Sequence, residues 1–187
     1  MAKEIELRRH TDSEGDVLTR DGIEAALALG ATLRGGYDVL VSSGAHRATE
    51  TLACLACALG ERISGGAVVE CGLRSKVEDR WRRAYQQAGS GELEALRSAD
   101  PELVKQDSPI LGAALGRVLD ELPEGGRALV VGHSPTNEAA VLGLTGEIVA
   151  PMSNGAGALL VQEDGETRRP AAGLTSLAGG VIARTSL

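Results

Sequence analysis

Two histidines that lie far apart in the sequence could act on one substrate. His10 follows the run at residues 4–8 and His133 follows the run at residues 128–132, and both runs are typical of short buried strands. Ligands of open α/β sheets bind beyond the carboxyl ends of the strands, so the two imidazoles can converge there. Imidazole is a nucleophile and proton carrier near neutral pH, and the neighbouring Arg9 can hold a phosphate through a bidentate pair.

A third position supports an anion site at the same edge. Arg47 lies in the first turn of a predicted helix, where the helix dipole disfavours a cation, so an anionic ligand would explain it. His133 stands at a predicted helix entrance, where free backbone N–H groups favour anions. Each residue also has an ordinary explanation, with Arg9 on the surface as we expect for Arg8, and His10 as a loop histidine. Their joint placement favours a phosphate pocket with an imidazole nucleophile.

The elements that would position these residues alternate between strand-like and helix-like runs, which is typical of a largely parallel sheet. Strands are predicted over residues 4–8, 37–42, 67–70, 128–132 and 157–162, with a further edge strand at 179–184. Helices are predicted from an N-cap at Thr19 to about residue 33, and over residues 43–59, 110–122 and 135–144. We therefore expect one domain over residues 1–187, a three-layer α/β/α sandwich. The charged stretch at residues 73–107 would form a helical excursion that caps the site.

Composition excludes several classes of protein. The net charge of −7 argues against binding to a nucleic-acid backbone, and the 2% aromatic content argues against a single-stranded nucleic-acid platform. No run approaches the length of a membrane span or resembles a signal peptide, so we expect a cytoplasmic protein. Cys54 and Cys57 are expected to pack on a buried helix face, since no second ligand pair completes a zinc site.

The chain resembles the histidine phosphatase superfamily, which includes the cofactor-dependent phosphoglycerate mutases. Residues 7–10 resemble its Arg-His-Gly signature, and residues 18–22 resemble Leu-Thr-x-x-Gly. Residues 42–51 resemble Ser-Ser-x-x-x-Arg-Ala-x-x-Thr, residues 130–133 the second-histidine motif, and residues 154–157 the polar turn before the last strand. The ordered set, over about residues 5–162, is far more specific than the Arg-His pair alone. It implies a phosphoglycerate mutase-like fold.

The resemblance also implies roles. His10 would attack phosphorus and become phosphohistidine, which water would then hydrolyse. Arg9, Arg47 and His133 would surround the phosphoryl oxygens, and Ser13 would touch the phosphate. No metal or other cofactor would be needed.

Two departures from the family pattern bear on the chemistry. Thr11 replaces the glycine after the nucleophile, which could reshape the pocket slightly. Ser75 occupies the position of the usual proton-donating glutamate, and a serine does not readily protonate an alkoxide. Glu70 and Glu78 are substitutes, unless they are only surface residues. The alternative is that no strong acid is present, which would suit a good leaving group such as that of a phosphohistidine or phosphoramidate.

The sequence therefore predicts a metal-independent phosphatase that acts on a phosphorylated small molecule or a phosphohistidine protein. Arg74 and Arg80 are candidate substrate contacts, although the basic cluster around them could be a solvated helix face. Phosphoglycerate mutase-type transfer is a rival, disfavoured because the loop between His10 and Thr19 is short. The Ser75 departure favours a second rival, a non-catalytic phosphate-binding regulatory module. We expect neither nucleic acid nor membrane as a partner.

Overall fold

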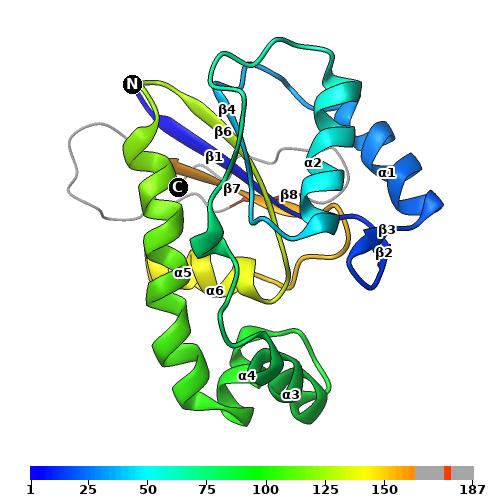
Figure 1. Ribbon diagram of the computed structural model, residues 1–187. Coiled ribbons are helices and arrows are strands. Elements are labelled where there is room, and N and C mark those ends of the chain that lie inside the picture. Colours follow the sequence, from blue (N-terminus) through cyan, green and yellow to red (C-terminus); the bar gives the residue numbers. More distant parts are fainter. Residues whose placement is uncertain (163–174, 178–187) are drawn as a thin grey trace.

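The computed structural model describes residues 1–162 and 175–177, in which six strands form one mixed sheet (Figure 1). Its order is β5-β4-β6-β1-β7-β8. The strands are β1 (Lys3–Arg9), β4 (Val39–Ser42), β5 (Ala67–Val69), β6 (Arg127–Gly132), β7 (Gly157–Gln162) and β8 (Thr175–Leu177). Strands β5, β4, β6 and β1 are parallel to one another, whereas β7 runs antiparallel to β1 and β8 antiparallel to β7. A small hairpin of β2 (Ser13–Glu14) and β3 (Val17–Leu18) follows β1.

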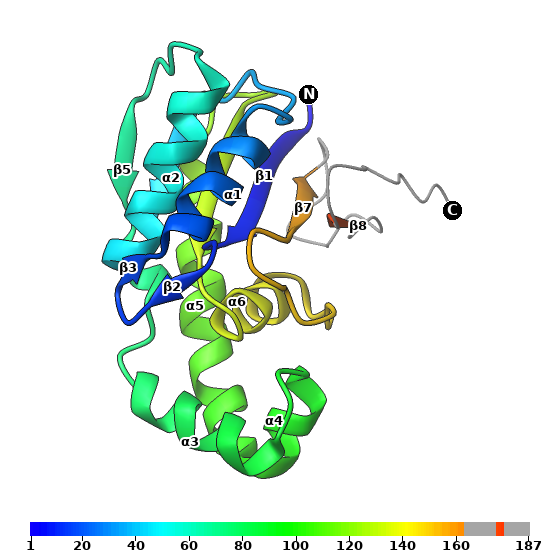
Figure 2. The same cartoon turned by 90° about the vertical axis from the view of Figure 1, so that its right-hand side faces the viewer.

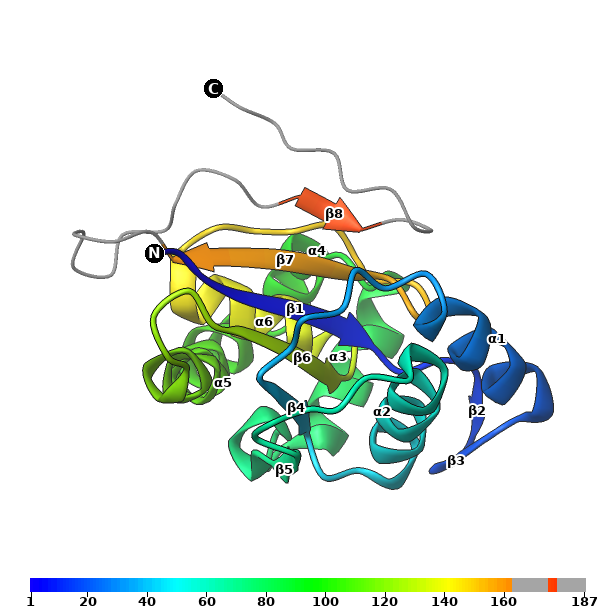
Figure 3. The ribbon, with the colours of Figure 1, turned by 90° about the horizontal axis from the view of Figure 1, so that it is seen from above.

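Helices cover both faces of the sheet, so the predicted three-layer α/β/α architecture is confirmed (Figure 3). One face carries α1 (Arg20–Gly30) and α2 (His46–Leu59), and the other carries α5 (Pro101–Glu121) and α6 (Thr136–Thr145). The excursion contains η1 (Cys71–Leu73), α3 (Glu78–Ala88) and α4 (Leu93–Ala99). Helices α3 and α4 lie beyond the carboxyl end of β1 (Figure 2).

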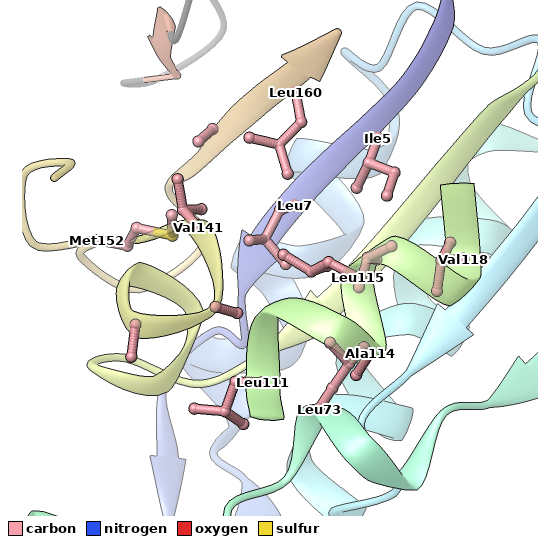
Figure 4. Packing of buried hydrophobic residues seen from close by; sticks show 14 of the residues in the cluster. Ile5, Leu7, Leu73, Leu111, Ala114, Leu115, Val118, Val141, Met152 and Leu160 are labelled. Carbon is pink, nitrogen blue, oxygen red and sulfur yellow. The ribbon is translucent and has the colours of Figure 1, made fainter. Parts of the chain in front are cut away.

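Two apolar clusters fill the space between these layers. Alternate residues of β6 face opposite sides, with Val130 in the cluster under α5 and α6, and Leu129 and Val131 in the cluster under α2. Figure 4 shows the first cluster, in which Leu115 of α5 packs near Leu7 of β1. A strand buried on both faces reads as a continuous apolar run, which is why β6 is evident from the sequence.

The register of the central strands brings the two histidines to one edge. Arg9 of β1 pairs with Gly132 of β6, and the backbone N–H of His10 donates to the Gly132 carbonyl at 3.0 Å. His10 and His133 therefore leave neighbouring parallel strands side by side.

Several sequence expectations differ from the structure. Helix α5 begins at Pro101 rather than residue 110, because the Asp100 carboxylate caps it by accepting from the N–H of Leu103 at 3.0 Å, and Pro109 is accommodated inside. Helix α1 ends at Gly30 rather than near residue 33. The edge strand predicted at residues 179–184 lies outside the described residues.

The expected environments of two side-chain types were also wrong. Arg8 is buried, not on the surface, because its guanidinium pairs with the Glu6 carboxylate at 2.6 Å. Cys57 is exposed and Cys54 half-buried, so this pair does not form the buried helix face that the apolar run indicated. None of the helices within residues 1–162 is long and apolar enough to span a membrane.

Candidate active site

The His10 ring is held in one tautomer by its neighbours. Its Nδ1 lies 2.7 Å from the Thr11 carbonyl oxygen, and its Nε2 lies 3.2 Å from the Nε of Arg47. A carbonyl oxygen can only accept and an arginine N–H can only donate, so Nδ1 carries the proton and Nε2 presents a lone pair. Burial lowers the pKa of His10, as do the charges of Arg47 and Arg9, while the bond to Thr11 opposes them. The free site therefore holds a neutral imidazole whose Nε2 lone pair accepts from Arg47.

Thr11, which stands where the Arg-His-Gly signature has its glycine, ties this loop to α2. Its backbone N–H donates to the Thr51 hydroxyl at 3.2 Å, and the two hydroxyl oxygens lie 3.3 Å apart. Thr51 in turn donates to the carbonyl of Arg47 at 2.8 Å. The nucleophile loop and the turn that carries Arg47 are thus fastened to each other.

Arg47 is held by a carboxylate that the sequence analysis did not single out. Its Nη1 lies 2.9 Å from the Oδ1 of Asp16, in the turn between β2 and β3. The backbone N–H of Arg47 donates to the same oxygen at 3.4 Å. Burial raises the pKa of Asp16, but the backbone N–H groups of Arg47 and His46 and the Arg47 charge outweigh it and lower the pKa overall, so this carboxyl is ionised at neutral pH. Asp16 therefore orients Arg47 and also neutralises part of its charge.

His133 lies against His10, with the ring centroids 5.3 Å apart. Its Nε2 is 2.9 Å from the hydroxyl of Ser43, the second serine of the Ser-Ser motif. Burial, and then the charge of Arg47, lower the pKa of His133 to about 3. His133 is neutral in the free protein, and it can give an oxyanion one N–H bond but no full positive charge.

Arg9, at the end of β1, is anchored to a segment far away in the sequence. Its Nη1 donates to the Met152 carbonyl oxygen at 2.9 Å. Its positive charge is among those that lower the pKa of His10, the next residue in the chain. Arg9, His10, Arg47 and His133 are therefore gathered at one sheet edge, as the sequence analysis expected.

Three further predicted residues lie on two different segments, Arg74 and Glu78 on the excursion and Ser13 on the hairpin after β1. Arg74 pairs with Glu78 at 2.5 Å, and the charge of Arg74 is among those that lower the pKa of His133. Ser13 lies in β2, in the hairpin that follows His10, and is half-buried. The charge of Arg74 thus reaches His133, and Glu78 is the carboxyl paired with that arginine.

Glu70 and Arg80 are engaged elsewhere. Glu70 pairs with Arg117 at 2.8 Å and accepts from the backbone N–H of Gly72, and the bond from Arg117 lowers its pKa. An ionised carboxylate of low pKa is a poor proton donor. Arg80 makes two 2.7 Å bonds to Asp100, the N-cap of α5, and so ties α3 to α5. The structure assigns both residues structural contacts.

Residues whose role the sequence did not reveal position the histidine loops. Asn137 accepts from the backbone N–H of His133 at 3.1 Å and donates to the Arg8 carbonyl at 3.0 Å. A Cβ at Gly132 would lie 2.3 Å from the Asn137 Oδ1, so only glycine leaves room for this bridge. A Cβ at Gly22 would likewise lie 2.0 Å from the Asp12 carbonyl oxygen.

Comparison with known proteins gives a fold and no sequence family. No protein-family model and no curated protein matches the sequence. A phosphoglycerate mutase from Bacillus anthracis superposes with a TM-score of 0.65 at 20% identity, over 91% of this chain and 92% of that one. A phosphoserine phosphatase from Entamoeba histolytica, in complex with 3-phosphoglyceric acid, gives a TM-score of 0.63 at 18% identity over 84% and 90%. The protein histidine phosphatase SixA, complexed with tungstate, gives 0.52 at 21% identity over 84% and 86%.

The chain has the fold that these phosphoglycerate mutase and phosphatase structures share. The phosphoglycerate mutase-like fold implied by the motifs is therefore confirmed. Within this fold, Ser75 is buried and its hydroxyl accepts from the backbone N–H of Val77 at 3.1 Å, so it caps a turn. In the part of the chain that the structure describes, no three His, Cys, Asp or Glu side chains are grouped to hold a metal ion.

Proposed function

We propose that the protein is a phosphatase that cleaves phosphomonoesters or phosphoramidates through a phosphohistidine on His10. The observation that carries the proposal is the His10 tautomer, with Nδ1 bound to the Thr11 carbonyl and Nε2 facing Arg47. A neutral imidazole with a directed lone pair, beside a guanidinium, can attack a phosphoryl group held by that guanidinium.

The reaction has two steps. His10 Nε2 forms a bond to phosphorus while the bond to the leaving group breaks, and the leaving group departs with the electron pair. Water then attacks the same phosphorus, the P–N bond breaks, and phosphate leaves with His10 restored. Arg9 and Arg47 offset the negative charge on the phosphoryl oxygens in both steps, and neutral His133 supplies an N–H donor.

The proton for the leaving group is the restrictive part of this chemistry. Glu70 is held by Arg117 with a lowered pKa, and Ser75 has a hydroxyl in place of a carboxyl. Of the two substitutes, Glu78 is the one linked to the site, through its pair with Arg74. These contacts favour substrates whose leaving group needs little protonation, such as the phosphoramidate of a phosphohistidine protein or of a small molecule.

Hydrolysis of p-nitrophenyl phosphate tests the proposal because its leaving group departs without a proton. We expect turnover that disappears in His10→Ala, whereas His46→Ala, which removes an exposed imidazole whose only site contact among the described residues is with the Asp16 backbone, retains it. Turnover that survives in His10→Ala, or none in the unaltered protein, would leave a non-catalytic phosphate-binding module as the better reading. Phosphoryl transfer to an added acceptor alcohol in preference to water would favour the mutase rival.

A second comparison tests the proton donor. With a poor alkyl phosphate, Glu78→Gln should slow any measurable hydrolysis, while Glu70→Gln should leave it unchanged. If neither variant differs from the unaltered protein, the leaving group receives its proton from another source.

A further inference from the structure

A fully buried carboxyl lies directly behind the site and takes no part in the chemistry described above. Glu138, in the first turn of α6, has 0% exposure. Its Oε1 accepts from the hydroxyl of Ser134 and from the backbone N–H of Met152, both at 2.6 Å. Burying a carboxyl costs free energy that its hydrogen bonds must offset. The two partners of Glu138 therefore show which groups this carboxyl holds in place.

Met152 links this carboxyl to the phosphate-binding side of the site. Its N–H donates to Glu138, and its carbonyl oxygen accepts from the Nη1 of Arg9 at 2.9 Å. The Met152 side chain is buried against α6, where it lies near Val141 (Figure 4), and its sulfur is 3.8 Å from the Asn137 Nδ2. A single residue therefore carries the connection from α6 to the guanidinium at the end of β1.

The charges of Glu138 and Arg9, the two residues that Met152 connects, act on each other. Burial raises the pKa of Glu138, and the charge of Arg9 is among the influences that oppose the rise. Within the described residues, Arg9 Nε and Glu138 Oε2 are both buried without a hydrogen-bond partner. The two groups are thus close enough to interact electrostatically, while their geometric connection passes through Met152.

We propose that Glu138 is the positioning residue of Arg9, and that it fixes the guanidinium by holding the Met152 backbone. The inference rests on the proposed function only in that Arg9 is taken to bind a phosphoryl group. Hydrogen bonding by Oε1 is the essential property, so glutamine can replace the carboxyl and an apolar side chain of similar size cannot.

Binding of inorganic phosphate, measured by calorimetry, tests this role without any need for turnover. Glu138→Leu leaves the Met152 N–H without its partner, and we expect phosphate affinity to fall about tenfold, as for the loss of one charge-assisted hydrogen bond. Glu138→Gln should bind within about threefold of the unaltered protein, because its amide oxygen can still accept from Met152. Ser134→Ala removes the other donor to Oε1 and should leave phosphate affinity unchanged.

A double-mutant cycle separates positioning from general stability. In an Arg9→Met background, Glu138→Leu should weaken phosphate binding no further, because the residue through which it acts is gone. A full tenfold loss in that background, or a Glu138→Gln as weak as Glu138→Leu, would overturn the proposal. If Glu138→Leu fails to fold, Glu138→Asp takes its place, since the shorter side chain keeps the carboxyl but cannot reach both donors.

The outcome is distinguishable from failure of the proposed function. Coupled phosphate binding with no His10-dependent hydrolysis would refute the phosphatase and leave the role of Glu138 standing. Hydrolysis by His10 with no coupling between Glu138 and Arg9 would do the reverse.

Discussion

Asp16→Asn should make the protein bind inorganic phosphate more tightly. The Asp16 carboxylate shares Arg47 with any anion that binds there, and its Oδ1 accepts from the Arg47 Nη1 at 2.9 Å and from the backbone N–H. Asparagine keeps an oxygen that can accept both bonds but removes the negative charge. The substitution therefore preserves the orientation of Arg47 while it releases the positive charge for a phosphoryl group.

The size of the gain follows from the exposure of the pair. The Asp16 side chain is 47% exposed and that of Arg47 is 23% exposed, so solvent screens much of their attraction. Pairs of this kind contribute about 0.2–1 kcal/mol, which corresponds to a rise in phosphate affinity of up to about fivefold. Asp16→Ala, which removes charge and orientation together, should give a smaller gain or none.

The assay is the inhibition constant of inorganic phosphate, measured at low and high salt. The gain should shrink as salt screens the charge, and Glu14→Gln, an exposed acid in the same hairpin, should show little effect. The Asp16 charge also raises the pKa of His10, so its removal should move the acid limb of kcat/KM to lower pH. Phosphate binding in Asp16→Asn that is equal to or weaker than that of the unaltered protein at low salt would refute this account of Arg47.

Three further predictions concern stability and are checked by denaturant unfolding. His133 has a folded pKa of about 3 against 6.5 unfolded, so as pH falls below 6.5 the unfolded state takes up the proton first and stability is lost. His133→Gln should remove a loss of about 1.4 kcal/mol per pH unit between about pH 6 and pH 4, and an unchanged slope would contradict the burial of a neutral ring. Gly22→Ala should lower the free energy of unfolding by about 1–3 kcal/mol, because the new Cβ would meet the Asp12 carbonyl oxygen. Arg8→Met should cost about 3 kcal/mol by leaving the Glu6 carboxylate short of its closest cation, and a neutral result would show that Tyr37 and Arg127 suffice to hold it.

The part of the site that sequence reasoning found consists of residues next to strand ends. Strands β1 and β6 are evident as apolar runs, and a parallel sheet places their carboxyl ends together. His10 and His133 follow from that rule without any knowledge of packing. Arg47 follows in the same way, because it lies in the first turn of the helix after β4.

The sequence did not reveal the ion pairs that join distant segments. Asp16 meets Arg47 across 31 positions, and Glu70 meets Arg117 across 47. Neither partner can be chosen from charge pattern alone, since the chain has 26 acidic and 19 basic residues. The burial of Arg8 was unpredictable for the same reason, because only a partner such as Glu6 makes a buried guanidinium tolerable.

The three arginines near the histidines each have a carboxyl of their own, and this affects how the chemistry responds to pH. Arg47 contacts Asp16, Arg74 contacts Glu78, and Arg9 interacts with Glu138 through its charge. The remaining positive field, added to burial, is still enough to keep both histidines neutral in the free protein. A bound phosphoryl group brings negative charge and must raise both histidine pKa values again. In the proposed reaction the nucleophile is therefore neutral before the substrate arrives, and the acid limb of kcat/KM, which reports the free enzyme, should lie below the ordinary pKa of histidine.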